Sequence, residues 1–98
     1  MTKGGYVYIM TNKWHTVLYT GVTAHLTRRV TQHKERLDPK SFTAKDNCDI
    51  LVYYQGFSRI EDAIAEEKRI KGSSRITKLS LISAMNPTWK DLFDTLED

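Results

Sequence analysis

Two short apolar runs near the start of the chain restrict its fold more than any other feature. Residues 6–10 and 17–20 are rich in β-branched and aromatic side chains, which is typical of strands. Only residues 11–16, which are mostly polar, separate the two runs. A parallel pair needs a crossover of about a dozen residues or more, so these strands must pair antiparallel as a hairpin.

The next segments predict a helix and a third strand. Thr23 is a plausible N-cap, and the apolar residues that follow it recur at the spacing of one helical face. The pair Asp38-Pro39 ends this helix, because proline disfavours the helical conformation of the residue before it. A loop over residues 40–49 then leads to a third strand over residues 50–54.

The second half of the chain predicts two or three more helices. Residues 58–61 fit a capping box, with Glu three positions after Ser, and Gly72 is a good helix end. Another helix is expected over residues 74–85, before Pro87, and a short one after Thr88. The apolar residues of the helix over 74–85 recur at every third position: Ile76, Leu79, Ile82 and Met85.

These elements predict an α+β fold in a single domain, residues 1–98. The expected order is strand, strand, helix, strand, helix, helix, with a short C-terminal helix as a further element. We expect a small three-stranded antiparallel sheet flanked by helices, because each helix must bury its apolar face against the sheet.

Charge and cysteine content limit the compartment and the partners. The single cysteine, Cys48, cannot form an internal disulfide, and no run of residues is apolar enough for a signal peptide or a membrane span. We therefore expect a cytoplasmic protein. Residues 1–45 hold eight Lys and Arg against two acidic residues, net +6, whereas residues 46–98 hold seven against ten, net −3. A basic first half suits an anionic partner, although a solvated surface gives the same pattern.

Some polar residues fall where apolar ones are expected. Glu67 lies on the apolar stripe of its predicted helix, three residues after Ile64 and three before Ile70. A carboxylate there is costly unless it is paired or binds a metal. Arg29 and His33 lie on the edge of the inward face of the first helix. The alternative for each is a polar group that reaches solvent from the rim of the core.

Tyr6-Val7-Tyr8 is followed, eleven residues after Tyr8, by Tyr19-Thr20-Gly21. With this pair of motifs the chain resembles the GIY-YIG nuclease superfamily, and within it the small stand-alone bacterial branch. Arg29 follows ten residues after Tyr19, as the essential arginine of the family does. Residues 63–68 resemble the helix of the metal-binding glutamate, and residues 85–89 resemble the last motif, with its asparagine.

The chain departs from the family pattern at a few positions. The first motif reads Tyr-Val-Tyr and the second Tyr-Thr-Gly, but both tyrosines and Gly21 remain. Asp46 lies near a position where the family usually has an aromatic residue. Residues 72–74 lie where close relatives often have a tryptophan. These changes concern substrate contacts more than the core chemistry.

The resemblance implies a metal-dependent endonuclease that hydrolyses DNA phosphodiester bonds. Its selectivity would be weak or based on substrate structure, and DNA repair or processing are the implied pathways. Glu67 would hold Mg²⁺ or Mn²⁺, and the products would be a 5′-phosphate and a 3′-hydroxyl. Tyr8 would serve as or relay to the general base, Tyr19 would orient water or phosphate, and His33 would carry a proton. The other implied site residues are Arg29 on the phosphate, Asn86 in the last motif, and Gly21 as a structural residue. From their charge, we also expect Arg28, Lys34, Lys40 and Lys45 to contact nucleic acid.

Two other hypotheses remain open from the sequence. The scaffold could bind nucleic acid without cutting it, through the basic residues of the first helix and the loop after it. The apolar tail after Thr88 could instead be a docking helix for another protein, although a cap on the chain's own core explains it as well. We expect a monomer without membrane association, and any targeting would come from substrate shape or a partner protein.

Overall fold

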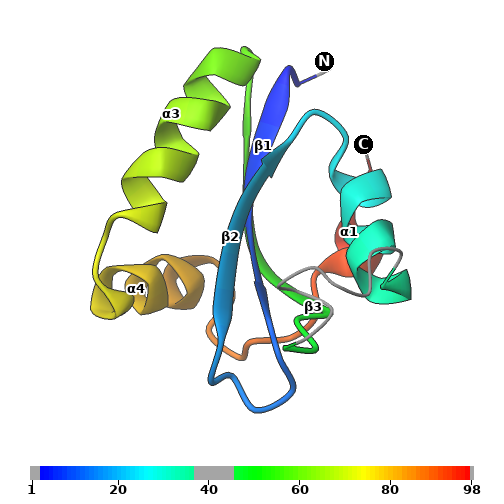
Figure 1. Cartoon of the computed structure of the whole chain (residues 1–98), viewed down its shortest axis with the longest axis vertical. Helices are drawn as coiled ribbons and strands as arrows, with labels where there is room; N and C mark the ends of the chain where they lie inside the picture. Colours follow the sequence, from blue (N-terminus) through cyan, green and yellow to red (C-terminus); the bar gives the residue numbers. More distant parts are fainter. Residues whose placement is uncertain (1–2, 37–45, 98) are drawn as a thin grey trace.

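Three antiparallel strands form a sheet in the order β2-β1-β3, as the α+β prediction requires (Figure 1). The computed structural model describes residues 3–36 and 46–97. Its elements follow the predicted order: β1 (Gly5–Thr11), β2 (Leu18–Thr23), α1 (Leu26–Glu35), β3 (Ile50–Phe57), α3 (Ile60–Lys71), α4 (Arg75–Met85) and a 3₁₀ turn, η1 (Phe93–Thr95). The predicted fold class is confirmed, and β2 and β3 are longer than expected.

The two faces of the sheet are covered by different elements. Figure 1 shows α3 and α4 on one side of the sheet, and α1 with the C-terminal segment on the other. Alternate residues of the central strand β1 point to opposite faces. The α3-side cluster contains Val7, Ile9, Val52, Tyr53, Ala63, Ile70 and Ile82. The α1-side cluster contains Tyr8, Met10, Leu26, Val30, Cys48, Leu51 and Leu92.

A β-bulge in β3 changes the alternation of side chains in that strand. Ile9 pairs with Tyr53 and Met10 pairs with Leu51, so Val52 is the additional residue. Val52 and Tyr53, although consecutive, both join the α3-side cluster. Tyr54 and Leu51 are thereby left on the α1 side. The bulge therefore decides which tyrosines of β3 face which helix.

Asn86 fastens this bulge to the segment after α4. Its side chain is 2% exposed, and its amide donates to the Val52 carbonyl at 3.3 Å and to the Lys90 carbonyl at 2.7 Å. Its side-chain oxygen accepts from the Lys90 amide at 3.1 Å. An amide with this many internal bonds holds the end of α4 against β3.

Two predicted helix starts are wrong by one or two residues. Thr23 is the last residue of β2, and the N-cap of α1 is His25. The Thr23 hydroxyl still accepts from the His25 amide at 3.1 Å, so it organises the turn before the helix. Ser58 makes no capping box, because the N-cap of α3 is Arg59 and no side chain caps it. The Arg59 carbonyl accepts the first helical bonds, and the Ser58 backbone lies against Gly4.

The helix ends were predicted better. Gly72 follows the last residue of α3, and Ser74 is the N-cap of α4, with its hydroxyl accepting from the Thr77 amide at 3.2 Å. The described part of α1 ends at Glu35, with Arg36 in the left-handed conformation. The predicted stop at Asp38-Pro39 lies outside the described residues.

The predicted apolar stripe of α4 is only partly buried. Ile82 is fully buried, whereas 76% of Ile76 and 40% of Met85 are exposed. The end of α4 contacts the sheet, since the Met85 sulfur accepts from the Tyr54 amide at 3.5 Å and Asn86 follows directly. Ile76, in the first turn of α4, belongs to neither core cluster. Ile76 therefore follows the apolar spacing of the helix without being part of the core.

The C-terminal segment covers the chain's own core. The short helix expected after Thr88 is only the 3₁₀ turn η1. The Leu92 amide donates to the Leu51 carbonyl at 2.8 Å, and Leu92 is 5% exposed in the α1-side cluster. The docking-helix hypothesis is therefore wrong for these residues. Within residues 3–36 and 46–97, none of the helices combines the length and the apolar character needed to cross a membrane.

Two α4 variants test this packing. Ile82→Ala should lower the free energy of unfolding by about 2–5 kcal/mol, because it leaves a cavity in the core. Ile76→Ala, its matched control, should change that free energy by less than about 0.5 kcal/mol, because the side chain is exposed. Urea denaturation measures both values. Equal losses in the two variants would contradict the orientation of α4.

Candidate active site

The Tyr8 ring lies across the backbone of the neighbouring strand. Tyr8 pairs with Gly21 in the β1–β2 register and is 1% exposed. A Cβ atom added to Gly21 would lie 2.5 Å from Cζ and from the hydroxyl oxygen of Tyr8. Real Cβ atoms do not approach other atoms so closely, so any side chain at position 21 would displace the ring. Gly21 therefore fixes where the Tyr8 hydroxyl lies.

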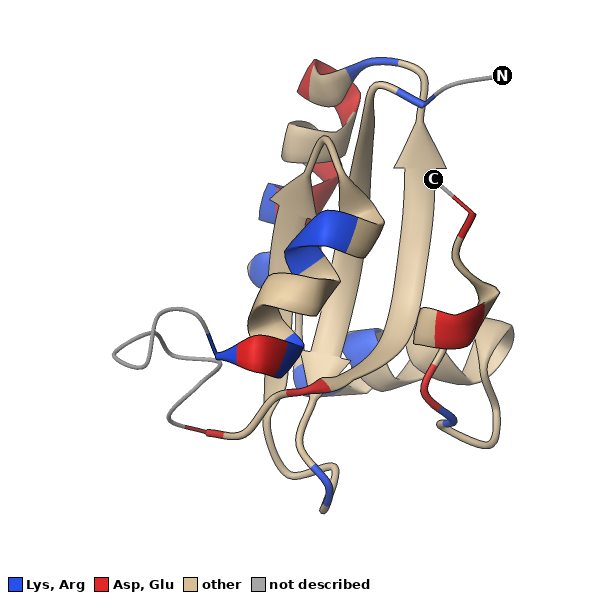
Figure 2. Cartoon of the chain, turned by 90° about the vertical axis from the view of Figure 1, so that its right-hand side faces the viewer, with Lys and Arg blue, Asp and Glu red and all other residues tan. Residues whose placement is uncertain are grey.

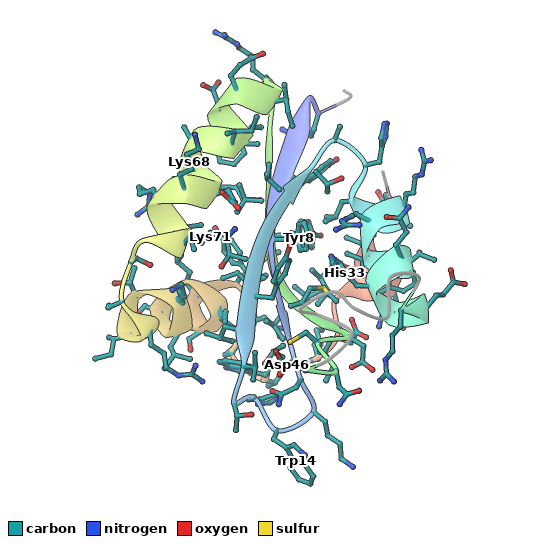
Figure 3. The ribbon with its side chains drawn as sticks, in the orientation of Figure 1. Tyr8, Trp14, His33, Asp46, Lys68 and Lys71 are labelled. Atoms are coloured by element: carbon teal, nitrogen blue, oxygen red, sulfur yellow. The ribbon has the colours of Figure 1, made fainter. Side chains whose placement is uncertain are left out.

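The Tyr8 hydroxyl is hydrogen-bonded to His33 of α1. The oxygen lies 2.8 Å from Nε2 of His33, and the two rings point toward one another between the sheet and α1 (Figure 3). Burial, and then the charge of Arg29, lower the pKa of His33 to about 4. His33 is therefore neutral near pH 7, and its Nε2 can accept a proton.

The phenol itself holds its proton in this environment. Burial raises the pKa of Tyr8 and the charge of Tyr19 adds to this, whereas a hydrogen bond from Arg29 and its charge lower it. Burial has the largest effect, so the hydroxyl keeps its proton near pH 7. Tyrosine and histidine together form a neutral, hydrogen-bonded pair.

Tyr19 completes a group of three rings. It pairs with Met10, which places it on the same face as Tyr8 and diagonal to it. Its ring centroid lies 6.3 Å from that of Tyr8 and 5.5 Å from that of His33. The sequence hypothesis that the tyrosines of the hairpin face one site therefore agrees with the geometry.

Arg29 lies one turn before His33 on α1, with its side chain at the exposed rim of this group. Nη1 donates to the Gln32 side-chain oxygen at 3.0 Å. The charge of Arg29 acts on both members of the buried pair, since it lowers the pKa of Tyr8 and of His33. A guanidinium in this place can receive an anion from solvent next to the tyrosine hydroxyl.

Glu67 lies on α3, on the other side of the sheet from the Tyr8 hydroxyl. Helix α3 packs on β1 and β2, and the Glu67 side chain is 12% exposed. Its charge contributes to the raised pKa of Tyr8, so the two groups act on each other across the sheet. Figure 3 shows Lys71 of α3 and Tyr8 on either side of β2.

Because Glu67 is the one described carboxylate at this site, only some kinds of metal ion suit it. Within the described residues, no group of three or more His, Cys, Asp and Glu could hold an ion. Mg²⁺ takes few protein carboxylates and keeps several of its waters, so Glu67 alone is a fitting donor. In the structure the Glu67 carboxylate is paired with the Lys71 ammonium at 3.0 Å. The carboxylate is therefore partly buried, and its partner is a cation that a bound metal would have to displace.

The remaining predicted site residues lie apart from this group or outside the description. Asn86 lies at the end of α4, where all its described bonds are internal. Lys34 is bound to Asp91 and to the Asp49 carbonyl, at 2.5 and 2.8 Å, so it ties α1 to two later segments. Arg28 is exposed on the first half of α1, where Figure 2 shows basic residues. The expected contacts Lys40 and Lys45 lie outside the described residues.

Lys71 was missed by the sequence analysis. It follows Glu67 by four residues, and such a pair on a helix is a recognised stabilising spacing. The neighbouring Glu66 has a different partner, since Arg69 donates to both of its oxygens at 2.7 and 2.6 Å. Two consecutive carboxylates of α3 thus have separate environments.

Known proteins resemble this chain in both sequence and fold. Residues 4–80 match the family described as the GIY-YIG catalytic domain. The chain belongs to this family. UPF0213 protein SH2523 of Staphylococcus haemolyticus (strain JCSC1435) is 36% identical over 77 residues, which are 79% of this chain and 92% of that protein. This GIY-YIG chain also resembles the solution NMR structure of UPF0213 protein BH0048 from Bacillus halodurans, with a TM-score of 0.56, 29% identity, and coverage of 89% and 90% of the two chains.

The contact between Gly21 and Tyr8 can be tested by a double-mutant cycle. Gly21→Ala should lower the free energy of unfolding by about 1–3 kcal/mol, because its methyl group meets the ring. In a Tyr8→Leu background the same change should cost clearly less. Gly72→Ala is the control, since its added Cβ meets its nearest atom at 3.5 Å and its φ is −83°. An equal cost of Gly21→Ala in both backgrounds would rule out the proposed contact.

The low pKa of His33 predicts a specific pH dependence. The unfolded chain binds this proton more readily than the folded chain, so the free energy of unfolding should fall as pH decreases from 6.5 to about 4. A His33→Gln variant should lose less stability over that range. His25→Gln, at an exposed position, should behave like the wild type. Thermal unfolding at several pH values measures this, and identical profiles for wild type and His33→Gln would refute it.

Proposed function

We propose that this GIY-YIG chain is a divalent-metal-dependent endonuclease that hydrolyses phosphodiester bonds in DNA. The observation that carries the proposal is the buried Tyr8–His33 hydrogen bond, with Arg29 at its exposed side and Glu67 across β2. Family membership supports the reaction class, and the arrangement supports the roles of the residues.

The resting site holds one transferable proton between two neutral groups. We assign the proton of neutral His33 to Nδ1, so that protonated Tyr8 donates to Nε2 at 2.8 Å. When His33 takes this proton, the tyrosine oxygen becomes a base that can accept a proton from water. The water oxygen can then attack phosphorus as the scissile P–O bond breaks, and the leaving 3′ oxygen takes a proton from solvent, which gives a 5′-phosphate and a 3′-hydroxyl. Tyr19, beside both rings, would orient the water or the phosphate.

Substrate binding would make this proton transfer easier. Burial and, second to it, the charge of Arg29 lower the pKa of His33, so the imidazole is a weak base while the guanidinium has no anion beside it. A phosphodiester bound to Arg29 would offset that charge, and the pKa of His33 would rise. The relay would then be most effective when substrate is present. Asn86 would act as a positioning residue, since it holds β3 and α4 together.

Glu67 would hold the cation, and Mg²⁺ or Mn²⁺ fits a single carboxylate that leaves room for water ligands. When bound, the cation would supply positive charge that stabilises the phosphate and lowers the pKa of the attacking water. Lys71 would leave the carboxylate or share it. Arg28 and Arg29 on α1 would contact further phosphates, and Lys40 and Lys45 are proposed for the same role.

Cleavage assays with end-labelled substrates test the function. The panel contains single-stranded, duplex, nicked, flapped and branched DNA, and RNA, each with Mg²⁺, with Mn²⁺ and with chelator. Glu67→Gln and Arg29→Ala should each lower the cleavage rate by about 10²–10³, the loss typical of removing one group that stabilises the transition state. Glu66→Gln is the matched control and should cut like the wild type, because Glu66 is paired with Arg69.

Circular dichroism and thermal unfolding should give nearly wild-type values for Glu67→Gln, since the pair with Lys71 is partly exposed. A folded Glu67→Gln variant that cuts at the wild-type rate would contradict the mechanism. Binding without cutting, weakening steeply with salt and unaffected by chelator, would favour the alternative of a non-catalytic binding module. That alternative is supported only by the exposed basic residues of α1.

A further inference from the structure

A cavity of about 620 Å³ lies where β2 turns into α1, outside the group of residues used above. Its volume falls in the range of small-molecule sites, roughly 300–1,000 Å³. Ala24 and His25 line it from the turn, Tyr6 and Tyr54 from the sheet, and Leu96 from the C-terminal segment. Three separate parts of the chain thus enclose one space on the α1 side.

The lining suits a flat, uncharged aromatic group. Tyr6 and Tyr54 are partly buried against the α1-side cluster, and so is Leu96. Tyrosine rings stack on nucleobases with little dependence on base identity. Lys3 and Glu97 lie at the rim and can bond to the polar edges of a base or sugar. The acidic residues of the C-terminal segment (Figure 2) disfavour a phosphate there.

The cavity is next to the candidate active site on the same face of the sheet. Tyr54 is the direct cross-strand partner of Tyr8, and Tyr6 is two residues before it on β1. The bulge at Val52 keeps Tyr54 on this face. Arg29 begins the next turn of the helix whose first residue, Leu26, lines the cavity. A strand with one phosphate at Arg29 would therefore bring a neighbouring nucleotide to the cavity.

We propose that this cavity binds the base of an unpaired nucleotide next to the scissile phosphate. The inference rests on the proposed nuclease function and adds a substrate class: strands with at least one unstacked nucleotide at the cut site, such as single strands or flaps. In a continuous duplex the base would first have to leave its stack, which costs free energy.

Binding is tested first without cleavage. Deoxyadenosine monophosphate is titrated into the full chain carrying Glu67→Gln, and the ring resonances of Tyr6 and Tyr54 are followed by NMR. We expect saturable shifts at both rings. Adding Ala24→Trp should abolish them, because Ala24 is exposed at the mouth and an indole there fills the cavity. Ala84→Trp, on the exposed side of α4, is the control and should keep them.

The same variants are then compared with oligonucleotides. Ala24→Trp should weaken binding of a single-stranded oligonucleotide by about tenfold, the order expected for losing the stacking of one base. Duplex binding should change by less than about twofold, because paired bases do not enter the cavity. Ala84→Trp should leave both affinities unchanged. Far-ultraviolet circular dichroism establishes that each variant is folded.

The outcomes separate this inference from the nuclease proposal. No saturable shift with the mononucleotide, or unchanged shifts in Ala24→Trp, would overturn the cavity assignment even if the wild type cuts DNA. Mononucleotide binding with no effect of Ala24→Trp on single-stranded affinity would overturn the link to the strand. If both binding effects occur and no substrate is cut, the cavity assignment stands and the nuclease proposal falls.

Discussion

The close approach of the Tyr8 ring to the backbone of Gly21 is the contact on which the site depends. It turns the ring of a central-strand residue toward the neighbouring strand, where its hydroxyl meets His33 and Tyr19 on one face. A Cβ atom at Gly21 would face the α1 side, against the rings of Tyr8 and Tyr19. The charge of Glu67, on the opposite side of the sheet, adds to the raised pKa of Tyr8, so groups from both layers act on one hydroxyl.

Burial has opposite effects on the two members of the hydrogen-bonded pair, and both effects favour the neutral form. It raises the pKa of the tyrosine and lowers that of the histidine. A neutral pair can be buried at low cost because its hydrogen bond satisfies both groups. Charge then comes only from the rim, through Arg29 and Glu67. This division between a neutral interior and charged edges keeps the site stable before any anion arrives.

The sequence predicted the parts of this structure that depend on local pattern. The hairpin followed from two strands too close for a crossover. The placing of Tyr8 and Tyr19 in one site came from the family resemblance, because the pattern of the hairpin alone does not set their faces. The predicted helix end at Gly72 and the predicted helix start near Ser74 were correct, because helix boundaries are set by nearby residues. Ser58 fitted a capping pattern, but its backbone packs against the start of β1, which a local pattern does not contain.

The parts that were missed depend on pairings between distant residues. The bulge at Val52 arises from the register of β1 and β3, so the face of Tyr54, and with it the cavity, was not predictable from alternation along β3. Ile76 fitted the apolar spacing of its helix, but only the end of α4 reaches the sheet. Lys34 was assigned to nucleic acid from its charge, whereas its partners Asp49 and Asp91 are far along the chain.

The ion pair between Glu67 and Lys71 gives the site its own counter-ion. A partly buried carboxylate without a partner would lose hydration that nothing replaces, which costs folding free energy. The Lys71 ammonium offsets that cost and sits on a flexible four-carbon stem, so it can withdraw without movement of the backbone. The pair that stabilises the carboxylate in the folded chain can therefore give way to another cation.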